Sequence, residues 1–130
     1  MSTWTPDQLQ RIVDADDLHI SPYRPDGTTP GTPTWIWCVA VDGLLYVRGY
    51  NGTASRWYQA AKTQRAGRIR TAGTEHRVTF ELIDASLNNA IDDAYRAKYA
   101  TSPYLPPMIG NRARAATIRI NPPSSLSLGL

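Results

Sequence analysis

Residues 48–57, RGYNGTASRW, contain the residue types and spacing best suited to chemistry in this chain. The order predicts the end of a strand, a glycine-containing loop and the start of a helix. Since a helix N-terminus has unpaired N–H groups, Arg48, Ser55 and Arg56 could converge on a phosphate or carboxylate. The segment therefore predicts an anion site. The alternative is an ordinary capped helix after a hairpin, with Arg48 paired to a carboxylate such as Glu81.

Residues 31–37 are the second candidate, because small residues there lead into a stretch with Trp35 and Trp37. Two indole rings could form walls that stack against a flat ring, as cofactor pockets often require. Packing of at least one indole in the core is the alternative. This segment predicts an aromatic wall of a ligand site.

Other reactive side chains have simpler structural explanations. Asp16 and Asp17 lie close to His19 and could hold a metal, but two adjacent acids more simply end a helix, so we expect no metal. Cys38 lies within an apolar run, so we expect a small buried residue. We expect His76, between two charged residues, at the surface.

The charge balance narrows the range of partners. The net charge is +3, and 12 of the 14 basic residues are arginine, which favours bidentate recognition of carboxylate or phosphate. High GC content of the source genome is an alternative cause of that bias. The basic clusters at 64–70 and 112–114 are not interleaved with aromatic residues, so we expect no nucleic-acid partner.

The same composition argues against a membrane protein. No apolar run is long enough to span a bilayer, and the first ten residues lack the pattern of a signal peptide. We therefore expect a cytoplasmic protein without a membrane partner.

The elements that must position these candidates follow from periodicity and turn signals. A capping box of Thr5 and Gln8 predicts a helix over 5–15, and Asp42-Gly43 predicts a hairpin turn. The other expected elements are strands at 18–20, 34–41, 44–50, 68–71, 77–83 and 116–120, and helices at 56–66, stopped by Gly67, and 86–100.

This inventory of five or six strands and about three helices has hairpins and no regular βαβ alternation. It favours an α+β fold built on a small antiparallel barrel. We expect one domain over residues 1–120 and a mobile C-terminal tail over residues 121–130.

Four segments together resemble a known family: residues 15–22, 31–37, 42–58 and 91–99. They are similar to an uncharacterised bacterial domain-of-unknown-function family, grouped with the FMN-binding split β-barrels. More distantly the chain resembles deazaflavin-dependent nitroreductases and pyridoxamine-phosphate-oxidase-like proteins. The resemblance implies a split β-barrel that forms a homodimer.

The resemblance also implies a cofactor site. In these relatives a strand, a glycine-containing loop and a Trp-bearing helix hold the cofactor phosphate, and another strand edges the flavin ring. The matching positions here are Arg48, Asn51, Gly52, Ser55, Arg56 and Trp57 for the phosphate, and Thr32, Thr34 and Trp35 for the ring. One basic, glycine-containing segment of the deazaflavin-type relatives is replaced here by residues 24–27.

We therefore expect a protein that binds FMN or a deazaflavin for oxidoreductase chemistry on a small-molecule substrate. Tyr50 and Tyr58 are the candidates for orienting the substrate or for catalysis. Two alternatives stay open: a non-redox binding module for an anionic or aromatic metabolite, and a cofactor-free isomerase or cyclase. The latter would use Tyr50, Tyr58, His19 or an aspartate as acid–base groups.

Overall fold

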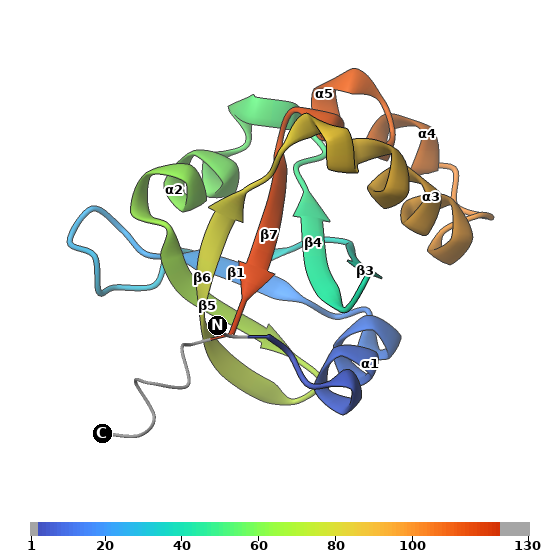
Figure 1. Cartoon of the computed structure of the whole chain (residues 1–130). Coiled ribbons are helices and arrows are strands. Elements are labelled where there is room, and N and C mark those ends of the chain that lie inside the picture. The colour runs from blue at the N-terminus through green and yellow to red at the C-terminus, as the bar shows by residue number, and fades with distance from the viewer. Residues whose placement is uncertain (1–2, 123–130) are drawn as a thin grey trace.

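The computed structural model describes residues 3–122 and shows an α+β fold (Figure 1). Over this range a seven-stranded antiparallel sheet has the order β2-β1-β5-β6-β7-β4-β3. The strands are β1 (His19–Pro22), β2 (Thr34–Trp35), β3 (Cys38–Val41), β4 (Leu44–Arg48), β5 (Ala66–Thr71), β6 (Thr74–Leu82) and β7 (Thr117–Asn121). The helices are α1 (Pro6–Ala15), α2 (Arg56–Gln64), α3 (Asn88–Lys98), α4 (Leu105–Met108) and α5 (Asn111–Arg114), with 3₁₀ turns η1 (Gly52–Ala54) and η2 (Ala85–Leu87).

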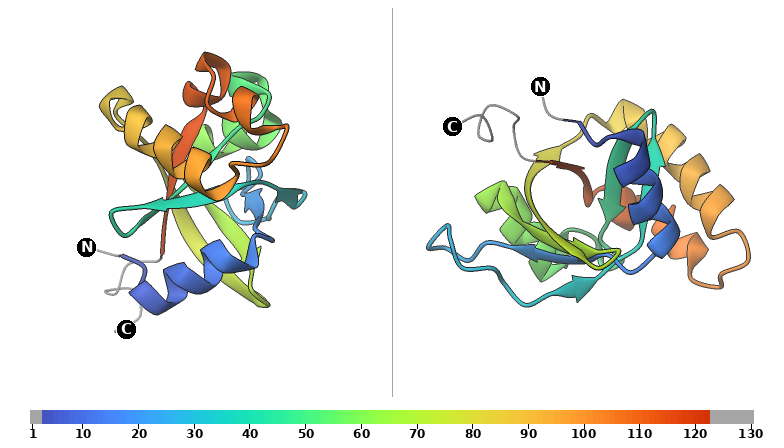
Figure 2. Two further views of the ribbon diagram at one scale, coloured as in Figure 1. Left: turned by 90° about the vertical axis from the view of Figure 1, so that its right-hand side faces the viewer. Right: turned by 90° about the horizontal axis from the view of Figure 1, so that it is seen from below.

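The sheet is curled into a half-barrel. Its two edge strands, β2 and β3, are consecutive in the chain and separated only by Ile36 and Trp37. A two-residue link is too short to cross a flat seven-stranded sheet, because strands are about 4.8 Å apart. The sheet must therefore bend until its edges approach each other, and Figure 2 shows this curvature in the view from below.

The expected single strand over residues 34–41 is wrong, because the chain leaves one edge of the sheet and enters the other. Trp35 pairs with β1, whereas Cys38 pairs with β4. The described residues form two hydrophobic cores, one inside the curled sheet and one under α3. From Ile36 onward the side chains alternate between them: Ile36 and Cys38 belong to the first, and Trp37 packs against the second. Trp35 lies outside this pattern and is exposed.

The strongest local signals are confirmed. The capping box is present, with the Gln8 amide donating to Thr5 and the Thr5 amide donating to the Gln8 side chain. Asp42 and Gly43 have φ values of 52° and 78° in the two-residue turn between β3 and β4. Such positive φ values are characteristic of a type I′ hairpin turn.

Gly67 does not end the helix, contrary to the prediction. Helix α2 ends at Gln64 with Arg65 as its left-handed C-cap, and Gly67 lies inside β5. A Cβ atom on Gly67 would lie 2.6 Å from the carbonyl oxygen of Ser21 and 2.9 Å from the ring of Phe80. Close packing, not a turn, therefore requires glycine here.

The described range contains more short elements than the five or six strands and three helices expected. Helix α4 is a single turn within residues 101–110, and α5 carries the basic cluster at 112–114. Strand β7 runs to Asn121, so most of the predicted tail at 121–130 lies outside the described residues. Within residues 3–122 no helix is long and apolar enough to cross a membrane.

Candidate functional site

One cleft of about 680 Å³ collects the exposed aromatic residues of the described chain. Trp35, Tyr50 and Tyr104 are 53%, 42% and 60% exposed. Among residues 3–122 they are the large hydrophobic side chains at the surface. We call this site the aromatic cleft. Its lining is Thr34, Trp35, Ile36, Trp37, Arg48, Tyr50, Asn51, Ser55, Arg56, Trp57, Tyr104 and Met108.

Two indoles of the aromatic cleft are held by the end of α1. The Trp35 indole N–H donates to the carbonyl oxygen of Asp16 at 3.2 Å. Trp37 stacks on Tyr99 with ring centroids 3.8 Å apart and 6° between the planes. The Tyr99 hydroxyl in turn donates to the Asp16 carboxylate at 2.6 Å. These contacts orient one wall of the cleft.

The opposite rim comes from the loop after β4 and from the segment before α4. The rings of Tyr50 and Tyr104 lie 6.4 Å apart at 70°, an edge-to-face arrangement. The Arg112 guanidinium lies 5.8 Å from the centre of the Tyr50 ring. A cation over an aromatic face is attractive, so Arg112 helps to hold Tyr50 at the mouth of the cleft.

Helix α2 begins at the aromatic cleft without a side-chain cap. Ser55 is its N-cap, as predicted, but its hydroxyl makes no capping hydrogen bond although Ser55 is only 8% exposed. The first N–H groups of a helix have no partner within the helix. Arg56 follows, exposed, and takes part in none of the ion pairs among residues 3–122. These groups can receive an anion.

A second cleft of about 680 Å³ adjoins the first and shares Thr34, Arg56 and Trp57 with it. We call it the polar cleft. Its lining is Pro22, Tyr23, Arg24, Pro25, Gly31, Thr32, Thr34, Arg56, Trp57, Gln59, Ala60, Thr63 and Gln64. The two clefts thus meet at the first turn of α2.

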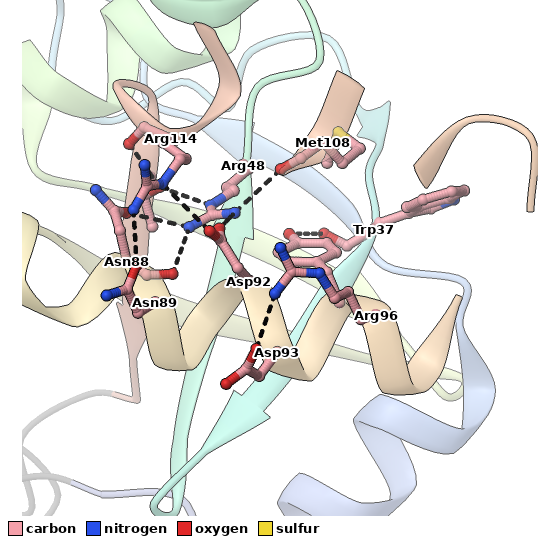
Figure 3. A network of polar contacts seen from close by, with 11 residues as sticks. Trp37, Arg48, Asn88, Asn89, Asp92, Asp93, Arg96, Met108 and Arg114 are labelled. Carbon is pink, nitrogen blue, oxygen red and sulfur yellow. Dashed lines mark hydrogen bonds and ion pairs between the residues drawn. The ribbon is translucent and has the colours of Figure 1, made fainter. Parts of the chain in front are cut away.

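Arg48 belongs to a buried cluster, shown in Figure 3, although it also lines the aromatic cleft. It is 1% exposed and pairs with Asp92 of α3. Its Nε donates to Thr117 at 3.0 Å, and its Nη atoms also donate to the Met108 carbonyl at 3.0 Å and to Asn88.

These five hydrogen bonds equal the five N–H donors of a guanidinium group. A phosphate at Arg48 would therefore have to displace an existing partner. A carboxylate does pair with Arg48, but the proposed partner Glu81 is wrong: Glu81 contacts Arg119 across β6 and β7. Arg114 adds a second cation to Asp92 at 3.3 Å. We call Arg48, Asn88, Asp92, Arg114 and Thr117 the Arg48 cluster.

The structure brings most of the predicted cofactor residues to one place. The residues that line the aromatic cleft are Thr34, Trp35, Arg48, Asn51, Ser55, Arg56 and Trp57. Thr32 lines only the polar cleft. Gly52 lines neither, because it packs against α5: a Cβ there would collide with the side chain of Arg112.

The two tyrosine candidates have different surroundings. Tyr50 lines the aromatic cleft, whereas Tyr58 is 6% exposed and packs edge-on against Trp57 in the core inside the sheet. Tyr104 and Met108, which line the aromatic cleft, and Arg112, which contacts Tyr50, are site residues that the sequence did not predict. They lie within or just after the proline-containing residues 101–110, which show no periodicity, so no local signal placed them at the cleft.

The remaining reactive side chains have structural roles. Cys38 is fully buried, and burial raises the pKa of its thiol, which confirms a small buried residue. Asp16 ends α1 in a left-handed conformation, and among the described residues no acidic, histidine or cysteine cluster could hold a metal. His76 is half-buried edge-on against Trp4, so its expected surface position is only partly correct; burial lowers its pKa.

Comparison with known proteins identifies the family of the chain. No curated protein matches the sequence. The sequence model of a family described as "Uncharacterized protein conserved in bacteria (DUF2255)" matches residues 8–120, which include both clefts and the Arg48 cluster. The chain therefore belongs to the uncharacterised bacterial family DUF2255.

Proposed function

We propose that the aromatic cleft binds a flavin or deazaflavin non-covalently and that the protein is an oxidoreductase built on a split β-barrel. One observation carries the proposal: the exposed large aromatic residues of the described chain all line one cleft, at the start of an uncapped helix. A flat ring that carries a phosphate needs this combination of aromatic walls and anion donors. The curled antiparallel sheet is consistent with a split barrel.

The residues present fit such a ligand in size and chemistry. A volume of about 680 Å³ lies within the range of roughly 300–1,000 Å³ that is usual for cofactor-sized ligands. Trp35, Tyr50 and Tyr104 would border the ring. The phosphate would bind to Ser55, Arg56 and the first N–H groups of α2, because the donors of Arg48 are already used.

These positions define separate roles for the cofactor and for the protein. A bound flavin or deazaflavin supplies hydride transfer. The chain holds the ring between aromatic side chains, neutralises the phosphate charge with Arg56 and excludes water from one face of the ring. Tyr50, which is exposed and lines the cleft, is the residue proposed to orient a substrate.

The test is a visible absorption spectrum of the freshly purified protein, followed by titration with FMN and with a deazaflavin cofactor. We expect binding, seen as ring absorption, tryptophan quenching and a raised melting temperature. Arg56→Gln should weaken FMN about tenfold, the effect of losing about 1.4 kcal/mol from one charge-assisted contact, with an unchanged melting temperature of the free protein.

Lys62→Gln is the matched control, because it removes one positive charge from the same helix but lines neither cleft. Equal losses of affinity in both variants would mean a general charge effect rather than a phosphate contact. Absence of binding by either cofactor would reject the proposed function. Stabilisation by another aromatic anion, with none from flavins, would then indicate a non-redox binding module.

A further inference from the structure

We propose that the polar cleft receives a hydrophilic, anionic arm of the same ligand whose ring lies in the aromatic cleft. The ligand is then elongated: a ring, an anionic group at the start of α2, and a second anionic group beyond it. The inference rests on the proposed function. It names the class of cofactor as a dinucleotide-like flavin rather than a mononucleotide.

The continuity of the two clefts is the first observation. Thr34, Arg56 and Trp57 line both. Arg56 therefore borders both clefts, and a ligand group bound to it lies next to each of them. Each cleft alone has the volume of a site for a cofactor-sized ligand, so a mononucleotide in the first would leave the second empty.

The residues that line the polar cleft are the second observation. Besides the rings of Trp57 and Tyr23, its wall offers hydroxyl, amide and guanidinium groups. These are the side chains of Tyr23, Arg24, Thr32, Gln59, Thr63 and Gln64. Such groups hydrogen-bond phosphate, sugar hydroxyl or carboxylate oxygens.

Arg24 is the residue that distinguishes this cleft from an ordinary polar groove. It lies in the loop between β1 and β2, which Figure 1 shows beside α2, and takes part in no ion pair among residues 3–122. Its backbone is fixed, because its N–H donates to the Thr29 carbonyl at 2.8 Å and Tyr23 bridges to Pro30. The loop thus fixes the point from which the Arg24 side chain reaches the polar cleft.

Ser55 marks the point where the anionic group joins the two arms. It is more than nine-tenths buried, lines the aromatic cleft, and its hydroxyl makes no capping bond to α2. A hydroxyl that does not cap its own helix, beside an arginine without an ion pair at the start of a nine-residue helix, is a donor set that an anion would complete. Arg56 and Arg24 would then bind two successive anionic groups.

The experiment is a titration of the full-length protein with three ligands that share one ring: riboflavin, FMN and FAD. Riboflavin has no phosphate, FMN has one, and FAD has two followed by a nucleoside. We expect FMN to bind about tenfold more tightly than riboflavin, and FAD about tenfold more tightly than FMN, because each added anion gains one arginine contact.

Two substitutions separate the steps of this series. Arg24→Gln should reduce FAD affinity about tenfold and leave FMN within twofold, whereas Arg56→Gln should weaken both. Thr63→Glu, an exposed position in the polar cleft, should weaken FAD alone by like-charge repulsion. Lys62→Gln controls for the loss of a positive charge outside the clefts.

Several outcomes would overturn the inference. FAD binding no tighter than FMN in the unsubstituted protein would show that the polar cleft is unused. Equal effects of Arg24→Gln on FMN and FAD would show long-range electrostatics rather than a contact. If riboflavin, FMN and FAD all fail to bind, the aromatic cleft does not bind the flavin ring. Both the proposed function and this inference are then rejected.

Discussion

Arg48 and Arg56 are eight residues apart in the sequence and lie in opposite environments. Arg48 is 1% exposed and uses all its donors inside the Arg48 cluster, whereas Arg56 is exposed and has no ion pair among residues 3–122. The same residue type thus holds the fold together at one position and is free to bind a ligand at the other. Burial together with available partners, not charge, separates the two roles.

The Arg48 cluster helps to position the elements that form the wall of the aromatic cleft. Arg48 connects β4 to α3 through Asp92, to α4 through the Met108 carbonyl and to β7 through Thr117. Tyr104 directly precedes α4, so the cluster helps to place that ring at the rim. A change in the cluster would therefore reach ligand binding indirectly, which makes substitution of Arg48 alone a poor test of phosphate contact.

The largest expected effect comes from removing one member of the buried ion pair. Asp92→Ala leaves the Arg48 guanidinium buried without its carboxylate, and should lower the free energy of unfolding by about 3–5 kcal/mol. Urea denaturation measures this value. Asp93→Ala on the same helix, whose carboxylate is exposed, is the control and should change stability by less than about 0.5 kcal/mol. Similar values for the two variants would contradict the structural role of the cluster.

A double substitution distinguishes a role of Arg48 in folding stability from a role in FMN binding. Arg48→Met with Asp92→Leu replaces the ion pair by apolar side chains, and should recover most of the stability that Asp92→Ala loses, to within about 1–2 kcal/mol of the original protein. Because Arg56, not Arg48, is proposed to hold the phosphate, FMN affinity should be retained. A stable double variant that has lost FMN binding would instead show that Arg48 contributes to the ligand site.

We expect two tryptophans of the aromatic cleft to differ in the same way: Trp37 contributes to folding stability and Trp35 to ligand binding. Trp37 is stacked on Tyr99, so Trp37→Leu should cost about 1–2 kcal/mol of folding stability. Trp35 is 53% exposed, so Trp35→Leu should cost no more than about 0.5 kcal/mol but should weaken FMN three- to tenfold, about 0.5–1.5 kcal/mol of lost stacking. Thermal unfolding and FMN titration measure the two effects. Unchanged FMN affinity in Trp35→Leu would show that the Trp35 ring does not contact the ligand.

The smallest effect concerns the loop that carries Arg24. Hydrogen bonds from the Thr29 hydroxyl, and from the amides of Thr29 and Thr28, lower the pKa of Asp26 from 3.8 to about 2. Since the folded pKa is below its ordinary value, the carboxylate stabilises the loop above about pH 4, and this stabilisation is lost as the pH falls to about 2. An NMR titration should show the low midpoint, and Thr29→Val should raise it. A midpoint near 3.8 in the unsubstituted protein would exclude these hydrogen bonds.

The parts of the fold that depend on neighbours in sequence could be predicted. The Thr5 capping box, the Asp42-Gly43 turn and the apolar spacing of α3 act over a few residues, so their signals survive any tertiary context. Gly67 was misread because glycine serves both helix ends and close strand packing, and only its contacts with Ser21 and Phe80 distinguish them. Long-range packing decided that case.

For the candidate site, the sequence by itself determined that Arg48, Ser55 and Arg56 lie on one strand–loop–helix segment, because loop length and helix signals are local. Only the tertiary structure decided which arginine is free. Asp92 lies 44 residues beyond Arg48, and no local pattern links them. The physical reason is that a guanidinium takes whichever acceptors the packed core brings to it, and those acceptors come from α3, α4 and β7 only after the sheet has curled.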